Sequence, residues 1–164
     1  MSLQGDSTDD LSSIPPPVPI GRGRRTRITV IDDAVEFLSL VTDVLEGSYD
    51  VTTSTGDDLD LEGLLRIDPD LIVLDLRLKE AGGQLTGMEL LRLIRAHRLL
   101  RFVPIVVCSA DVAQLTLNRE ALAQIPRCWV LRKPFSLDEF EAMLAEALRS
   151  GGHGPDEPAR SISG

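Results

Sequence analysis

The chain has 164 residues and a formal net charge of −9, from 26 acidic and 17 basic residues. Hydrophobic residues make up 43% of the chain, enough to build one domain with its own core. A chain this acidic is a poor general ligand for nucleic-acid phosphates, and we expect no DNA-binding domain in it. The apolar runs are shorter than the roughly 20 residues that cross a bilayer, and the amino terminus lacks a secretion signal. We therefore expect a cytoplasmic protein without membrane contact.

The two ends of the chain have the composition of disordered segments. Residues 1–26 contain a triple proline among Ser, Asp and Gly, and residues 150–164 are equally poor in apolar side chains, so we expect a flexible leader and a flexible tail. The basic stretch GRGRRTR at residues 21–27 favours a solvated linker, with a docking or nucleic-acid contact as the alternative. The ordered domain is predicted at residues 27–149.

Between these ends, apolar strand patterns alternate with helical spacing. Strands are predicted at 27–32, 49–55, 71–76, 104–110 and 128–133, and helices at 34–47, 57–67, 87–100, 113–125 and 136–150. In the last helix, Ser136 and Glu139 form a capping box, and a stripe of Leu137, Phe140, Leu144 and Leu148 is expected to be buried. Cys108 and Cys128 lie in or beside apolar runs without a C-x-x-C pair, which predicts buried thiols and not a zinc site.

The alternation predicts an α/β fold with a parallel sheet. Residues 28–31, 71–74 and 105–107 are continuously apolar, as expected of strands that helices cover on both faces, so we expect a three-layer α/β/α domain with five parallel strands. In such a sheet, functional groups collect at the carboxyl ends of the strands.

Polar side chains stand at these carboxyl ends. Asp32 and Asp33 follow the first strand, Asp75 follows the apolar run of the third, Ser109 ends the fourth, and Lys133 ends the fifth. Each residue alone could be a cap or a surface turn, but four such placements together favour one site. Carboxylates about 4 Å apart repel by roughly 4 kcal/mol per pair, which Lys133 and a hard divalent cation, Mg²⁺ or Mn²⁺, can offset. Beside these cations, a carboxylate is a credible nucleophile toward phosphorus.

The stretches VIDD, PDLIVLDLRL, GMELLRLIR, PIVVCSA and LRKPF, in this order, resemble the receiver domain of bacterial two-component response regulators. The resemblance implies a CheY-like, flavodoxin-like sheet of order 2-1-3-4-5. It implies that Asp75 is the phosphoacceptor, and that the metal is held by Asp32, Asp33, Asp75 and the backbone carbonyl of Arg77.

The resemblance extends to the phosphate contacts and the partners. Ser109 and Lys133 would contact the aspartyl phosphate, and the peptide bond before Pro134 would be cis. The donor would be a histidine kinase or a phosphotransfer protein. A downstream protein would bind the face of the fourth helix, fifth strand and fifth helix, and a homodimer is possible.

Three features depart from the family pattern. The loop at residues 77–87 is long, with Lys79 in place of a proline, and Gly82–Gly83 is expected to be its most flexible part. Val130 stands where the family has its switch aromatic, while Trp129, one residue away, is expected to be a core or interface ring on the opposite face of the strand. Arg77 and Asp111 occupy the positions that tune phosphate lifetime, and we hypothesise that they pair across the site.

Three functions remain open from the sequence. The favoured one is a phosphoacceptor signalling domain that catalyses no reaction beyond its own phosphorylation and dephosphorylation. A degenerate receiver that acts as a phosphorylation-independent interaction module is the alternative. A phosphohydrolase with an aspartate nucleophile is disfavoured, because such enzymes carry a second aspartate two residues later, where this chain has Arg77.

Overall fold

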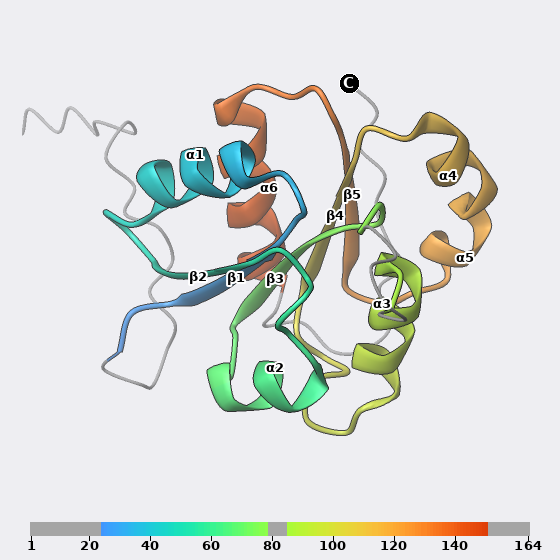
Figure 1. Cartoon of the computed structure of the whole chain (residues 1–164), viewed down its shortest axis with the longest axis horizontal. Helices are drawn as coiled ribbons and strands as arrows, with labels where there is room; N and C mark the ends of the chain where they lie inside the picture. The colour runs from blue at the N-terminus through green and yellow to red at the C-terminus, as the bar shows by residue number, and fades with distance from the viewer. Residues whose placement is uncertain (1–23, 79–84, 151–164) are drawn as a thin grey trace, which may run out of the picture.

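The computed structural model describes residues 24–78 and 85–150. Five parallel strands form one sheet in the order β2-β1-β3-β4-β5 (Figure 1). The strands are β1 (Arg27–Ile31), β2 (Asp50–Ser54), β3 (Leu71–Asp75), β4 (Ile105–Ser109) and β5 (Cys128–Arg132). This order confirms the predicted fold class, and it places the carboxyl ends of β1 and β3 side by side.

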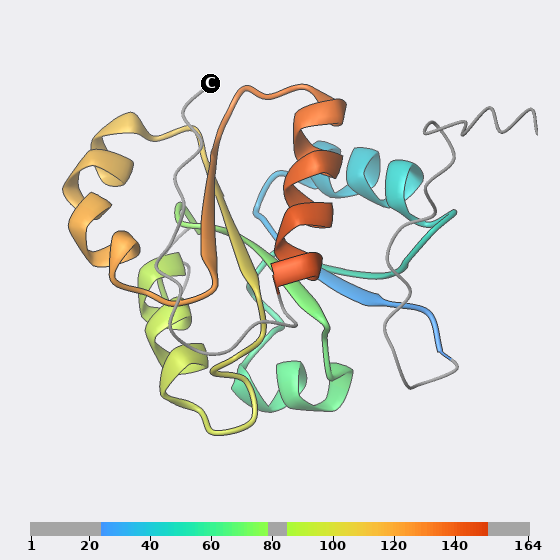
Figure 2. The ribbon, with the colours of Figure 1, turned by 180° about the vertical axis from the view of Figure 1, so that it is seen from behind.

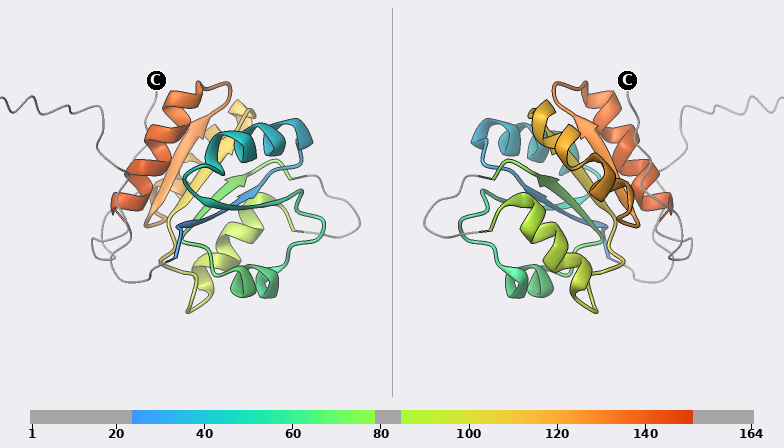
Figure 3. Two further views of the ribbon diagram at one scale, coloured as in Figure 1. Left: turned by 90° about the vertical axis from the view of Figure 1, so that its left-hand side faces the viewer. Right: turned by 90° about the vertical axis from the view of Figure 1, so that its right-hand side faces the viewer.

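Helices cover both faces of the sheet, as Figures 2 and 3 show from behind and from the sides. They are α1 (Val35–Leu45), α2 (Leu61–Ile67), α3 (Gly87–Ala96), α4 (Val112–Leu117), α5 (Arg119–Ala123) and α6 (Leu137–Ser150). Buried side chains of α1 and α6 pack on one face, and those of α2, α3 and α5 pack on the other. Within the described ranges, no helix combines the length and the apolar character needed to cross a membrane.

The strands divide the core into two clusters because successive side chains of a strand point to opposite faces. In β3, Leu71 and Val73 face α1 and α6, while Ile72 and Leu74 face α2 and α3. The same alternation in β5 places Trp129 in the first cluster and Val130 against the second. Trp129 is therefore a core ring on the opposite face from Val130, as predicted.

Two helix predictions need correction. The helix predicted at 113–125 is broken at Asn118 into α4 and α5, so the predicted fifth helix is α6. The side chains of Asn118 and Thr116 donate to carbonyls of the preceding turn, the kind of local bond that competes with a continuing helix. In α6 the capping box of Ser136 and Glu139 is confirmed, but Leu137 is 41% exposed.

Two arginines of the basic stretch, Arg24 and Arg27, contact the domain. Arg24 donates two hydrogen bonds to the Asp70 carboxylate, at 2.8 and 3.0 Å, and lies 3.7 Å from Asp68. Arg27 lies 3.7 Å from Asp68 through its side chain. The residues from Arg24 onward are thus part of the folded unit, although the sequence predicted a leader through residue 26. Three predicted flexible parts lie outside the described residues: the rest of the leader, the residues after Ser150, and Gly82–Gly83.

Candidate functional site

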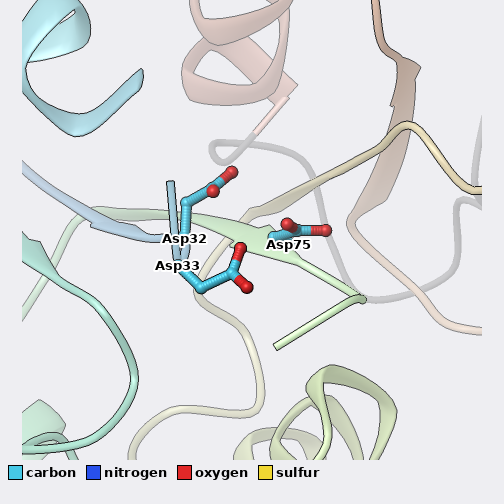
Figure 4. Close-up of side chains that lie close together, drawn as sticks. All are labelled: Asp32, Asp33 and Asp75. Carbon is cyan, nitrogen blue, oxygen red and sulfur yellow. The ribbon is translucent and has the colours of Figure 1, made fainter. Parts of the chain in front are cut away.

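Three carboxylates meet where β1 and β3 end, as Figure 4 shows. Asp32 and Asp33 follow β1 directly, and Asp75 is the last residue of the neighbouring β3. One oxygen from each of the three side chains lies within 4.8 Å of the others. The carboxyl edge of a parallel sheet therefore brings together the acidic residues that the sequence predicted.

Backbone hydrogen bonds continue the sheet past the last residues of β1 and β5. The N–H of Asp32 donates to the Ser54 carbonyl at 3.0 Å, and the N–H of Lys133 donates to the Ser109 carbonyl at 2.9 Å. Asp32, Asp75 and Lys133 each lie two residues after a side chain that faces α1 and α6. The period of two along extended strands thus sends all three side chains toward the same face.

Lys133 supplies a cation to this cluster. Its ammonium group donates a hydrogen bond to the Asp32 carboxylate and lies 3.9 Å from Oδ2 of Asp75. The peptide bond between Lys133 and Pro134 is cis, as the family resemblance implies. The Lys133 ammonium group therefore offsets part of the negative charge of Asp32 and Asp75.

Burial makes the charges of Asp32 and Asp75 costly. Asp32 is 1% exposed and Asp75 is 6% exposed. Burial raises the pKa of the Asp75 carboxyl above its ordinary value; the N–H of Arg77 opposes this rise, Asp32 adds to it, Lys133 opposes it, and Asp33 adds to it. Buried carboxylate oxygens that repel one another are the donor set that a hard divalent cation stabilises, so the residues fit the predicted metal.

Local hydrogen bonds fix the orientation of two of the carboxylates. Oδ1 of Asp32 accepts the N–H of Ala34 at 2.9 Å, and Oδ1 of Asp75 accepts the N–H of Arg77 at 2.9 Å. Each bond leaves the second oxygen of its carboxylate directed toward Lys133. The loops after β1 and β3 therefore hold these side chains in place before any ligand binds.

The start of α3 lies against the backbone of Asp75. A Cβ atom on Gly87 would come within 2.4 Å of the Asp75 carbonyl oxygen and 2.5 Å of the Leu76 Cα, so only glycine fits. A capping box, in which Thr86 and Glu89 bond each other's backbone N–H groups, fixes this end of the helix. The sequence pattern T-x-x-E carries that signal, and our sequence analysis missed it.

The remaining predicted site residues are Ser109, Arg77 and Asp111. Ser109 is fully buried at the end of β4, next to the strand that bears Asp75, and its Oγ accepts the N–H of Asp111 at 3.2 Å. Across residues 24–78 and 85–150, no ion pair joins Arg77 to Asp111, and the hypothesised pairing stays a prediction for the phosphorylated site. The Asp111 carboxylate instead accepts the N–H of Gln114 and caps α4, while the Arg77 side chain is exposed.

Comparison with known proteins agrees with this geometry. The model of the response regulator receiver domain matches residues 28–145. The chain belongs to this family. A curated relative, the protein-glutamate methylesterase/protein-glutamine glutaminase of Azospirillum brasilense, is 27% identical over 154 residues. The match covers 88% of this chain and 39% of that protein, so this chain spans less than half the length of that relative.

Solved receiver structures share the fold. NtrX from Brucella abortus has a TM-score of 0.66 at 24% identity, over 78% of this chain and 28% of that one. The receiver domain of a sensor histidine kinase from Pseudomonas aeruginosa has a TM-score of 0.60 at 26% identity, over 77% of this chain and 100% of that one. That second structure has a magnesium ion coordinated in its active-site cleft.

Proposed function

We propose that this receiver accepts a phosphoryl group on Asp75 from a histidine kinase or a phosphotransfer protein. The observation that carries the proposal is the buried Asp75 carboxylate, which lies beside Lys133 and within 4.8 Å of two further carboxylates. A carboxylate in a site that gathers cations is suited to attack phosphorus, because those cations offset the charge of the phosphoryl oxygens.

The transfer step follows from the orientation of Asp75. Oδ1 is held by the Arg77 N–H, so Oδ2, on the Lys133 side, forms the new bond to phosphorus. The P–N bond of the phosphohistidine donor breaks, and its electron pair leaves with the imidazole. Lys133 then lies where its ammonium group can pair with a phosphoryl oxygen.

Asp32, Asp33 and Asp75, with the backbone carbonyl of Arg77, would hold the metal ion. Magnesium is the proposed ion, and manganese is the proposed substitute, because both prefer oxygen ligands. When bound, the ion supplies charge neutralisation to the phosphoryl oxygens. Before binding, Lys133 partly offsets the charge of Asp32 and Asp75.

Ser109 is the proposed hydroxyl contact for the phosphate. Phosphorylation adds charge and strong acceptors at the strand ends, and the loops after Ser109 and Lys133 lead directly to α4 and α6. The face of α4, β5 and α6 is therefore the proposed docking face for a downstream protein or a second copy of the chain. The cytoplasm is the proposed compartment, and the chain is proposed to catalyse no reaction beyond its own phosphorylation and dephosphorylation.

One observation favours the alternative of a phosphorylation-independent interaction module. The position of the family's switch aromatic holds Val130, which packs against the second core cluster and has no ring to reorient. Such a module would keep one conformation and bind its partner whether or not Asp75 is modified.

The test is incubation with Mg²⁺ and acetyl phosphate followed by measurement of intact mass. We expect the addition of one phosphoryl group, absent in Asp75→Ala and retained in Asp70→Ala, which removes a carboxylate from the opposite edge of the sheet. An unmodified wild-type mass with all small phosphodonors, together with an absence of Mg²⁺ binding, would contradict the proposal and favour the interaction module.

A further inference from the structure

The Lys133 ammonium group has an aromatic neighbour in addition to its carboxylates. Its Nζ lies 4.3 Å from the centroid of the Phe37 ring, over the ring face. Phe37 lies in the first turn of α1, on the same loop-to-helix segment that carries Asp32 and Asp33. A cation over an aromatic face is attracted by the negative charge of the ring quadrupole. Lys133 is thus held from one side by Asp32 and Asp75, and from another by a ring.

The Phe37 ring is itself fixed by two other rings. Its centroid lies 6.0 Å from that of Phe135 and 6.1 Å from that of Phe140, both in edge-to-face contact. Phe135 and Phe140 stack on each other at 5.4 Å, and Phe140 is fully buried. These three rings, the aromatic trio, connect α1 to the loop after Lys133 and to α6. The trio therefore leaves the Phe37 ring little freedom to turn away from Lys133.

We propose that Phe37 is a positioning residue that holds the Lys133 ammonium group against Asp32 and Asp75 before phosphoryl transfer. The inference deepens the proposed function and rests on it. An ammonium group on a four-carbon stem is flexible, and its effect on a transferring phosphoryl group depends on placement before the reaction. The Lys133 side chain is 19% exposed, so the contact with the ring is partly shielded from water. Shielding strengthens cation–π attraction.

A purely structural role for Phe37 predicts a different outcome from a positioning role. If the ring only fills space in the first core cluster, an aliphatic side chain of similar size replaces it at a modest cost in stability and leaves Lys133 where it was. If the ring face holds the cation, an aromatic replacement preserves the contact and an aliphatic one removes it. Phe37→Leu and Phe37→Tyr therefore separate the two roles.

The first measurement is the rate at which each protein is phosphorylated by acetyl phosphate in the presence of Mg²⁺. We expect Phe37→Leu to lower the maximal rate about three- to tenfold, with the half-saturating donor concentration unchanged within about twofold. Phe37→Tyr should restore the rate. A wild-type rate in Phe37→Leu, or an equal loss in Phe37→Tyr, would overturn the positioning role. Thermal unfolding of each variant confirms that it is folded.

The second measurement observes the contact directly and needs neither metal nor donor. The sequence contains two lysines, Lys79 and Lys133, so protein with ¹³C-labelled lysine gives two sets of side-chain signals, and Lys133→Arg assigns them. We expect the ε-methylene protons of Lys133 to be shifted upfield by the Phe37 ring current. The shift should disappear in Phe37→Leu and persist in Phe37→Tyr. Phe102→Leu removes an exposed ring elsewhere and should leave the shift in place.

The two measurements distinguish failure of the inference from failure of the proposed function. If the wild-type protein takes no phosphoryl group, the proposed function is contradicted, and the lysine spectrum alone decides whether Phe37 holds Lys133. Lys133 signals at ordinary positions in the wild-type protein, or signals that Phe37→Leu does not move, would overturn the inference even if Asp75 is phosphorylated normally.

Discussion

The two edges of the sheet each carry a group of aspartates, and the two groups differ in burial and in the cations they meet. At the carboxyl edge, Asp32 and Asp75 are nearly fully buried and share the ammonium group of Lys133. At the amino edge, the side chain of Asp70 is 29% exposed and that of Asp68 is 60% exposed, and both meet guanidinium groups of the segment before and within β1.

The aspartates at the amino edge are paired with arginine side chains and accept hydrogen bonds. Asp70 accepts two hydrogen bonds from the Arg24 guanidinium group and a third, at 2.8 Å, from the N–H of Arg27. Water also reaches both carboxylates and solvates their charge, so a further cation would stabilise them little. The comparison teaches that aspartates alone do not make a reactive site, because burial is what separates the carboxyl-edge carboxylates from those at the amino edge.

The largest effect is expected from removing the cation of the buried group. In metal-free buffer, Lys133→Met should lower the free energy of unfolding by about 2–4 kcal/mol, because Asp32 is left as a buried charge without its ammonium partner. Urea unfolding with EDTA measures the loss. Excess Mg²⁺ should recover part of it, since a second cation then enters the cluster. If Lys133→Met had the same unfolding free energy as the wild type, Lys133 would not stabilise the buried aspartates, and the stated difference between the two edges would be contradicted.

A metal titration tests which edge binds the divalent cation. Asp33→Asn removes one negative charge while nearly preserving shape, and should weaken Mg²⁺ binding at least about tenfold. Asp70→Asn is the matched control and should bind Mg²⁺ as the wild type does. Isothermal titration calorimetry measures both affinities. Equal weakening by the two variants would show that Mg²⁺ does not distinguish the buried group from the exposed one.

The raised pKa of Asp75 predicts a stability that depends on pH. Burial, Asp32 and Asp33 all disfavour the ionised form, so the folded state loses stability as pH rises from the unfolded-state pKa through the folded-state pKa. Below both pKa values the carboxyl is protonated in both states and contributes no difference. Asp75→Asn should therefore raise the unfolding temperature by about 2–4 °C at pH 7 in EDTA.

Thermal unfolding across pH 4 to 8 is the measurement for Asp75→Asn, and the gain in unfolding temperature should shrink toward the acid end. The same substitution at the amino edge, Asp70→Asn, should lower the unfolding temperature, because it weakens hydrogen bonds to Arg24. A gain in Asp75→Asn that is constant with pH would contradict the role of carboxylate ionisation.

The smallest effect is expected from breaking the partly buried pair of Arg24 and Asp70. Arg24→Gln should cost about 0.5–1 kcal/mol of unfolding free energy, because the pair is partly solvated. The cost should shrink in 1 M NaCl, where charges are screened over about 3 Å. Phosphorylation of Asp75 should proceed at the wild-type rate. A cost comparable to that of Lys133→Met would show that the two edges hold their charges in the same way.

Strand patterns explain why the sequence predicted the carboxyl-edge site. Continuously apolar strands indicate a parallel sheet, and parallel strands end at one edge, so Asp32, Asp33, Asp75 and Lys133 were expected at the same edge. The order of the strands came from the family resemblance and is confirmed. Apolar patterns with a fixed period can be recognised from the sequence alone.

The sequence patterns did not predict the contacts between side chains of distant segments. The contact of Phe37 with Lys133 joins α1 to the residue that follows β5, and helical spacing within one segment does not predict such a contact. The sequence did not show that Asp111 caps α4, where its Oδ1 accepts the N–H of Gln114. The break at Asn118 was missed for a similar reason, since bonds from polar side chains to nearby carbonyls leave the apolar pattern unchanged.

The tight fit of Gly87 against the Asp75 carbonyl has a consequence for how the segment between them can vary. Leu78 on one side is buried in the second core cluster, and the capping box of Thr86 and Glu89 holds the other side. With both flanks anchored, residues can be gained or lost between them without displacing the phosphoacceptor. The length of this segment is therefore set independently of the position of Asp75.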